Sequence, residues 1–137
     1  MTRLNPPPEA LFAPETDRWT APYWEGLVAR RLTVPRCAAC GTFRMPPTPV
    51  CPACRSSALD WPEAGPEGRL YTWTLVTRAI LPGMEGAVPY APAVVELPSA
   101  GSVRLVTCLI DADPAALRLG QTLRLRWHRR SDGLQLP

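Results

Sequence analysis

Four cysteines with the spacing of metal ligands stand near one another in this 137-residue chain. Cys37 and Cys40 form one Cys-x-x-Cys pair, and Cys51 and Cys54 form a second pair after ten intervening residues. Tetrahedral zinc accepts four thiolates, and two tight Cys-x-x-Cys turns supply two each. The spacing therefore predicts a zinc ribbon, which we place in residues 35–63.

Two other uses of these thiols are less consistent with the sequence around them. A redox Cys-x-x-Cys opens a helix after a strand and needs only one pair, whereas neither "GTFRMPP" nor "RSSALDW" is typical of a long helix. Rubredoxin-type iron uses the same four thiolates, so the sequence leaves zinc and iron open. A closed shell of four cysteines has no free position for water or substrate, so we expect a structural metal rather than a catalytic one.

Few other residues could carry out chemistry. All fifteen basic residues are arginines, and the absence of lysine excludes Schiff-base chemistry and a lysine-bearing phosphate loop. His128 is the single histidine and the one position for histidine-based acid–base catalysis. Cys108 lies among strand residues, where we expect it to act as a small buried hydrophobe, because a nucleophile would need His128 beside it.

Composition and charge point to a cytoplasmic protein. The formal charge is only +3, and the chain has no long basic stripe of the kind that binds nucleic acid. No run approaches the roughly 20 apolar residues of a membrane span, and "MTRLNPPPEA" lacks the apolar core of a secretory signal. In the cytoplasm thiols stay reduced, which favours metal binding over disulfides.

The elements before the cysteines are an extended arm and a short helix. Residues 1–20 contain three successive prolines and predict the arm. Residues 21–34 predict an amphipathic helix, with Thr20 as its N-cap and Pro22 in its first turn. Its apolar face consists of Tyr23, Trp24, Leu27 and Val28. Because so short a helix needs burial to be stable, this face packs either on its own domain or on a partner protein.

Residues 64–137 have the texture of β-structure. Segments rich in Val, Leu, Thr, Tyr and Trp alternate with turn residues, and one helical turn is expected near residues 113–120. The expected strands lie in residues 68–81, 90–98, 102–111, 121–128 and 134–136. Together they predict a five-stranded OB-fold barrel, closed or partly open. The fold class is therefore mainly β, with an N-terminal helix, a four-cysteine ribbon and this barrel.

The only local basic cluster lies near the end of the chain and consists of Arg124, Arg126, Arg129 and Arg130. Strand alternation predicts that Arg124, Arg126 and His128 share one face. Arginine forks suit the phosphates of coenzyme A, and the same cluster could follow a nucleic-acid backbone or simply be solvated.

Several segments in this order resemble a known family. They are "YWEGLVARRL", "VPRCAACGTFRMPPTPVCPAC", "GRLYTWTLVTRA", "VPYAPAVVEL" and "LIDADPAALRLGQTLRLRW", which together span about residues 20–137. The chain resembles the DUF35 proteins, which combine a rubredoxin-like zinc ribbon with an OB-fold and are associated with acyl-CoA enzymes. The family's zinc positions map onto the same four cysteines.

The resemblance implies a companion role rather than an enzyme acting alone. Similar proteins associate with thiolase-like enzymes, including the lipid-transfer-protein type that cleave steroid side-chain acyl-CoA esters by retro-aldol chemistry. Others associate with MaoC-like hydratases or ketosynthase-type enzymes. The resemblance also implies a heterotetramer. In it the thiolase-like subunit carries the acid–base residues, while this chain supports assembly and helps to shape the coenzyme A channel.

Two other classes of function stay open at this point. One is a nucleic-acid-binding module, because OB-folds and zinc ribbons both serve that role. The other is an autonomous acyl-CoA-binding or acyl-chain-binding protein, in which the loop "ILPGMEGAVPYAPA" would form a mobile lip over the ligand.

Overall fold

The computed structural model describes residues 2–9 and 13–137, and it confirms the predicted mainly β class. Within these residues no helix is both long and apolar enough to cross a membrane. The regular elements are α1 (Ala21–Val28), β1 (Arg36–Cys37), β2 (Leu59–Asp60), β3 (Glu67–Trp73), β4 (Ala91–Leu97), β5 (Val103–Leu109), β6 (Thr122–Arg124), β7 (His128–Arg129) and β8 (Gln135–Leu136). Two 3-10 turns, Pro98–Ala100 and Pro114–Ala116, complete the set, the second at the predicted helical turn.

Helix α1 is shorter than the predicted span of residues 21–34. The backbone amides of Ala29 and Arg31 both donate to the carbonyl of Gly26, at 3.0 and 2.8 Å, and Arg30 takes a left-handed φ of 55°. The chain then turns back, because Leu32 and Val34 are buried in the core. Burial of these two side chains therefore ends the helix before Pro35 is reached.

The start of α1 also differs from the prediction. Thr20 occupies the N-cap position, but its side chain accepts no hydrogen bond from the helix. Instead its hydroxyl donates to Asp17 Oδ1 at 3.1 Å, and the same carboxylate oxygen accepts from the amides of Trp19 and Thr20. The Asp17 turn thus satisfies the amides that precede the helix.

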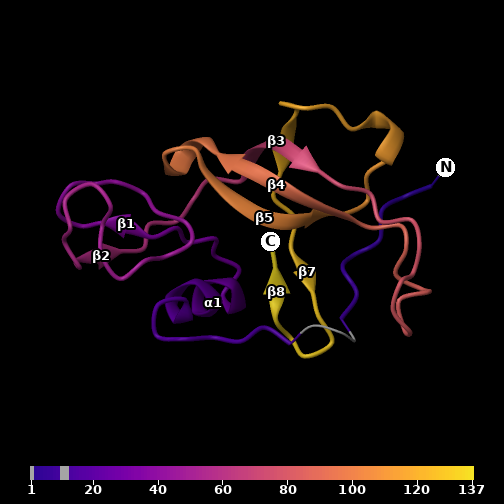
Figure 1. Ribbon diagram of the computed structural model, residues 1–137, viewed down its shortest axis with the longest axis horizontal. Coiled ribbons are helices and arrows are strands. Elements are labelled where there is room, and N and C mark those ends of the chain that lie inside the picture. Colours follow the sequence, from indigo (N-terminus) through magenta and orange to yellow (C-terminus); the bar gives the residue numbers. More distant parts are fainter. Residues whose placement is uncertain (1, 10–12) are drawn as a thin grey trace.

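The ribbon module lies beside the sheet, on the same side of the molecule as α1 (Figure 1). Its strands β1 and β2 are antiparallel, with Arg36 opposite Asp60. The Arg36 guanidinium donates to both oxygens of Asp60, at 3.0 and 2.8 Å, which is the two-point geometry that makes arginine–carboxylate pairs directional. This pair fixes the register of the two short strands that flank the cysteine turns.

The remaining strands form an open, twisted sheet in the order β5-β4-β3-β6, and β7 pairs separately with β8. Strand β3 carries an irregularity between Leu70 and Thr72, which bends it as the sheet curls. Among the described residues no ladder joins β8 to β5. At this seam, the open edge between β5 and β8, the Thr107 hydroxyl donates a hydrogen bond to the Pro137 carbonyl. Of the two predicted forms, the barrel is therefore the partly open one.

The core fills the concave side of the sheet. Strand β4 alternates buried and half-buried residues along its length, as expected for one face turned to a core. Tyr23 and Leu27 reach this core from α1, which packs next to β8 (Figure 1). Leu4 enters it from the N-terminal arm, with only 2% of its surface exposed.

The N-terminal arm was predicted to be extended, and part of it, residues 1 and 10–12, lies outside the described residues. Residues 2–9, here called the N-terminal strap, contain no helix or strand. Leu4 nevertheless exchanges two backbone hydrogen bonds with residues 111 and 112, at 3.2 and 3.0 Å, and the amide of Asn5 donates to the Pro89 carbonyl at 2.8 Å. The strap is therefore attached to the OB-type domain.

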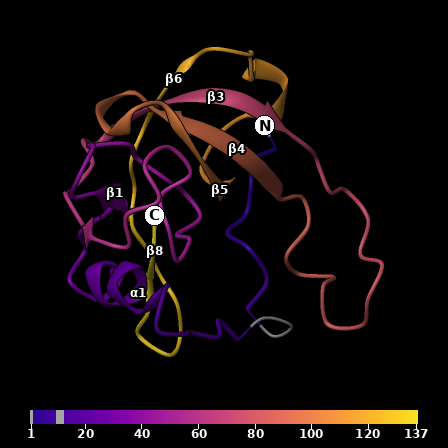
Figure 2. The same cartoon turned by 60° about the vertical axis from the view of Figure 1, so that its left-hand side comes forward.

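The predicted first strand of the barrel ends earlier than residue 81. Strand β3 stops at Trp73, and after it the segment of residues 74–90 projects from the body (Figure 2). A single bridge between Val76 and Tyr90 holds its base, while Ile80 near its tip is 76% exposed. Apolar residues in this segment suggested a longer strand, but no neighbouring strand is available to pair with them among the described residues.

Candidate functional site

The four predicted metal ligands converge on one point. Their Sγ atoms all lie within 4.8 Å of one another, with 3.5 Å between Cys37 and Cys54 and 3.6 Å between Cys40 and Cys51. Zinc–thiolate bonds of about 2.3 Å would place tetrahedral sulfurs about 3.8 Å apart. The arrangement therefore fits a tetrahedral four-thiolate metal ion with only small adjustments.

Two equivalent turns present these thiols. The amide of Gly41 donates to the Cys37 carbonyl at 2.9 Å, and the amide of Arg55 donates to the Cys51 carbonyl at the same distance. Both donors have a left-handed backbone, with φ of 77° and 64°. Glycine adopts this conformation without strain, so Gly41 indicates the first turn in the sequence, whereas Arg55 gives no such indication of the second turn.

Hydrogen bonds tune the thiols of the cluster differently. The Thr42 hydroxyl lies 3.2 Å from Cys40 Sγ, and together with the Thr42 backbone amide it lowers the pKa of Cys40 to about 6. The Ser56 amide favours the thiolate of Cys54, but the neighbouring thiols of Cys37 and Cys40 raise the pKa of Cys54 to about 12. Cys54 therefore holds on to a proton that a metal ion must displace.

The ribbon contains a buried arginine, Arg44, whose positive charge calls for a negative charge nearby. Arg44 is 5% exposed, and its three guanidinium nitrogens have no hydrogen-bond partner among the described residues. A buried cation is costly unless a negative charge balances it. A divalent metal with four thiolates carries about two negative charges, so a loaded cluster would place negative charge in the same module as Arg44.

The predicted partner-facing residues of α1 divide into two groups. Tyr23 and Leu27 point into the core of this chain, and burial raises the pKa of Tyr23 to about 12. Trp24 is half-buried, with its ring against that of Tyr23 at 5.2 Å between centroids. Val28 is 67% exposed. Only Trp24 and Val28 therefore present surface that a partner could contact.

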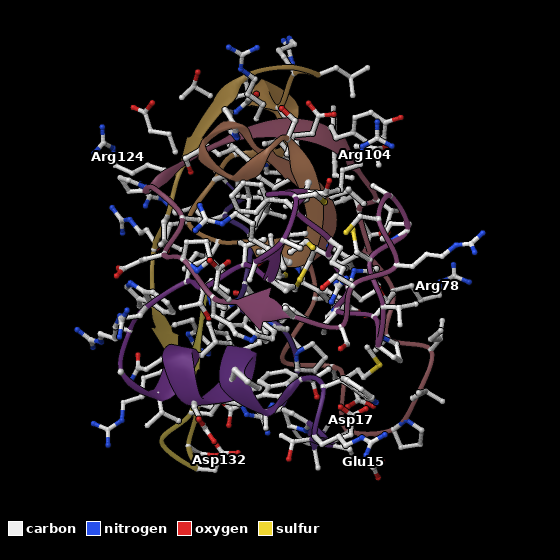
Figure 3. All side chains as sticks on the ribbon, turned by 90° about the vertical axis from the view of Figure 1, so that its left-hand side faces the viewer. Glu15, Asp17, Arg78, Arg104, Arg124 and Asp132 are labelled. Atoms are coloured by element: carbon white, nitrogen blue, oxygen red, sulfur yellow. The ribbon has the colours of Figure 1, made fainter. Side chains whose placement is uncertain are left out.

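The four clustered arginines do not form one continuous strand face, because β6 ends at Arg124 and β7 begins at His128. Arg124 points away from the body of the molecule (Figure 3) and lies 3.8 Å from Glu67, while Arg126 lies 3.5 Å from Asp111. Arg130 pairs with Asp132 at 3.2 Å, and Arg129 is exposed. The Arg124 and Arg126 pairs are long and exposed, so they cost little to exchange for a phosphate, whereas the Arg130 side chain is only 10% exposed.

Cys108 and His128 line the same cavity, but no hydrogen bond joins them in the described structure. Burial raises the pKa of Cys108, which keeps its thiol protonated and unreactive. This environment supports the expectation that Cys108 acts as a small packed hydrophobe.

The cavity itself was not visible in the sequence. It has a volume of about 560 Å³ and lies at the open seam of the barrel, between the sheet, α1, the β7–β8 hairpin and the strap. Its walls come from many separate parts of the chain, from Pro7 to Pro137, so no local motif marks it. The nearest signal was the alternation of Leu123, Leu125 and Trp127, of which the two leucines line the wall.

A four-cysteine ribbon followed by an open OB-type sheet defines the class of zinc-ribbon and OB-fold proteins. Sequence comparison agrees with the fold: residues 24–60 match the "ChsH2, rubredoxin-like zinc ribbon domain", and residues 61–128 match the "ChsH2, C-terminal OB-fold domain". The chain belongs to the ChsH2 family of DUF35 proteins, which confirms the resemblance drawn from the sequence.

Three relatives illustrate the family. A solved structure titled "Ltp2-ChsH2(DUF35) aldolase" is 37% identical with a TM-score of 0.83, over 91% of this chain and 95% of that one. The "Probable enoyl-CoA hydratase alpha subunit" of Thermomonospora curvata is 37% identical over 95% of this chain and 40% of its own length. The "3-oxo-4,17-pregnadiene-20-carboxyl-CoA hydratase alpha subunit" of Mycobacterium tuberculosis is 31% identical over 85% and 36%. The chain thus spans about two fifths of the curated relatives that it matches.

Proposed function

We propose that this chain is a non-catalytic companion subunit of a thiolase-like acyl-CoA lyase that cleaves steroid side-chain acyl-CoA esters by retro-aldol chemistry. The observation that carries the proposal is the likeness, over nearly the whole length of both chains, to the ChsH2(DUF35) component named in an aldolase structure. The steroid acyl-CoA in the name of the mycobacterial relative supports the substrate class.

The chemistry of the chain is consistent with a companion rather than a catalyst. Its metal cluster uses four protein thiolates and leaves no open position, so the zinc ion that we assign to it would stabilise the ribbon and bind no substrate. The chain has no lysine and one histidine, and its fifth cysteine is held in the thiol form. The acid–base residues of the lyase therefore belong to the partner, in a cytoplasmic heterotetramer.

Two surfaces of this chain would serve the complex. The exposed Val28 and half-buried Trp24 of α1 would contact the partner. Arg124, Arg126, Arg129 and Arg130 would meet the phosphates of coenzyme A, since guanidinium groups bind phosphate oxygens in two-point geometry. Their weak pairs with Glu67 and Asp111 can be exchanged when a phosphate arrives.

The proposal is tested by reconstituting activity with a thiolase-like protein from the same organism. We expect release of the cleaved ketone from a β-hydroxy steroid acyl-CoA only when both chains are present. Loss of the four-cysteine cluster should abolish this release, because the ribbon no longer folds. Full activity of the thiolase-like protein alone, or hydration of an enoyl-CoA by this chain's complex without any cleavage, would contradict it.

A further inference from the structure

Arg44 is a buried charge that the proposed function does not use. Its side chain is 5% exposed, and its three guanidinium nitrogens have no hydrogen-bond partner in the described part of the chain. A buried cation without a partner is among the costliest groups that a fold can contain. Its burial therefore indicates that negative charge develops nearby.

The acidic residues of the ribbon are already paired with other arginines. Residues 35–63 contain two carboxylates, Asp60 and Glu63. The Arg36 guanidinium donates to both oxygens of Asp60. Arg31 Nε lies 3.2 Å from Glu63 Oε2. The remaining side chains of this module that can become negative are the four cysteines, which lose their protons when they bind a metal.

The backbone beside the first cysteine turn places Arg44 on the same face as Cys37. A bridge pairs Arg36 with Phe43 in antiparallel orientation. Backbone hydrogen bonds donated by the amides of Cys37 and Arg44, at 2.8 and 2.9 Å, flank this bridge on either side. Because successive residues of a strand point to opposite faces, Cys37 and Arg44 share the face opposite to that of the bridged pair.

The contacts of these residues agree with this assignment of faces. The Arg36 guanidinium lies over the Phe43 ring, 5.8 Å from its centroid, so these two side chains are on one side of the bridge. On the other side, Cys37 is 1% exposed and Arg44 is 5% exposed, so little water is available to screen them. Residues diagonal to each other across two strands are roughly 7–8 Å apart. The Arg44 side chain therefore begins one step along the strands from a metal ligand.

We propose that Arg44 is the counter-charge of the loaded four-cysteine cluster and makes the ribbon favour a divalent metal ion over a trivalent one. Four thiolates around a divalent ion carry two negative charges, whereas the same thiolates around a trivalent ion carry one. A fixed positive charge stabilises the more negative of these two states, and burial keeps water from screening it. The inference goes beyond the companion role and does not depend on it.

Loading the full chain with iron makes this preference measurable, because the one-electron couple of the metal interconverts the two charge states in the same fold. Arg44→Met keeps the approximate length of the side chain and removes its charge. Over roughly 8–10 Å, at an effective dielectric constant of about 20, this change should shift the balance from Fe(II) toward Fe(III) by about tenfold or more. A tenfold shift corresponds to a reduction potential lower by about 59 mV, measured by spectroelectrochemical titration.

Arg55→Met is the matched control, because Arg55 directly follows Cys54 but is exposed, so water already screens its charge. It should lower the potential much less than Arg44→Met does. Arg44→Lys keeps a positive charge and should restore most of the native potential, which a role in packing alone would not explain. Arg44→Gln also removes the charge, and it replaces Arg44→Met if that chain fails to fold.

Competition between Zn²⁺ and In³⁺ tests the same preference without iron, because the two loaded clusters also differ by one unit of charge. By elemental analysis, Arg44→Met should raise the uptake of In³⁺ relative to Zn²⁺ by a similar factor. Equal shifts in the Arg44→Met and Arg55→Met chains, or no shift in either, would overturn the proposal. So would a potential in Arg44→Lys as low as that in Arg44→Met. None of these outcomes alters the reconstitution result expected for the companion role, so the two proposals fail separately.

Discussion

Glu9 and Ser131 join two ends of the molecule that are 122 residues apart in the chain. Glu9 Oε2 accepts hydrogen bonds from the amide and the hydroxyl of Ser131, at 3.0 and 2.6 Å. The partners lie at the end of the strap and in the turn of the β7–β8 hairpin. This contact, with Leu4 at the other end, attaches the strap across the open seam of the barrel.

The contact should weaken in acid. Hydrogen bonds from the Ser131 hydroxyl and amide lower the pKa of Glu9. A carboxyl group whose pKa is lowered by folding stabilises the folded state above its ordinary pKa, and this contribution is lost as the pH falls through the lowered value. In a carbon-detected NMR titration, Ser131→Ala should raise the Glu9 midpoint. An unchanged midpoint would mean that the contact does not form in solution.

Removal of one metal ligand should unfold the ribbon. We expect one zinc ion per chain, and Cys51→Ser should lose it and the hydrogen-exchange protection of residues 35–63, because this module is too small to fold on a core of its own. Elemental analysis distinguishes zinc from iron. Cys108→Ser is the control and should retain the metal. A metal-free chain that keeps the ribbon protected would contradict a structural role for the cluster.

Gly101 should be needed where the ribbon meets the OB-type domain. It has a left-handed φ of 64°, and a Cβ placed there would lie 2.9 Å from the ring of Phe43. Gly101→Ala should cost the roughly 1–2 kcal/mol of left-handed strain and an additional amount for the contact, measured by urea unfolding. Gly120→Ala has the same strain with open space around it, so it should cost less. Equal losses would show that Phe43 moves aside freely.

The outer and inner residues of α1 should respond differently to substitution. Val28→Asp should leave the melting temperature nearly unchanged and weaken capture of the thiolase-like partner, because Val28 is exposed. Leu27→Ala, at a fully buried position, should cost about 2–5 kcal/mol of stability. Val50→Asp on the ribbon is the matched surface control. Normal partner capture by Val28→Asp would exclude this face from the interface.

The sequence predicted the features that depend on neighbouring residues. The four cysteines lie within 18 residues, so their spacing alone indicated the cluster that the structure contains. Alternation in residues 91–97 and 103–109 likewise placed β4 and β5. The apolar periodicity predicted a helix longer than α1. The pattern of apolar residues continues past Val28, whereas the backbone turns at Arg30 to bury Leu32.

Features that depend on distant residues could not be predicted. Leu4 is a single apolar residue in a proline-rich segment, and its burial depends on hydrogen bonds to residues 111 and 112. The open seam of the barrel could not be predicted either, because sequence alternation predicts strands but not whether two distant strands pair. The cavity follows from that missing ladder, so it became visible only with the strands in place.

The companion role is tested most directly by purifying this chain from its native host under gentle conditions and identifying what accompanies it. We expect a stable complex with a thiolase-like protein in equal amounts, with the mass of a heterotetramer by light scattering. Recovery of a lone monomer, with no thiolase-like protein in any fraction that contains this chain, would contradict it.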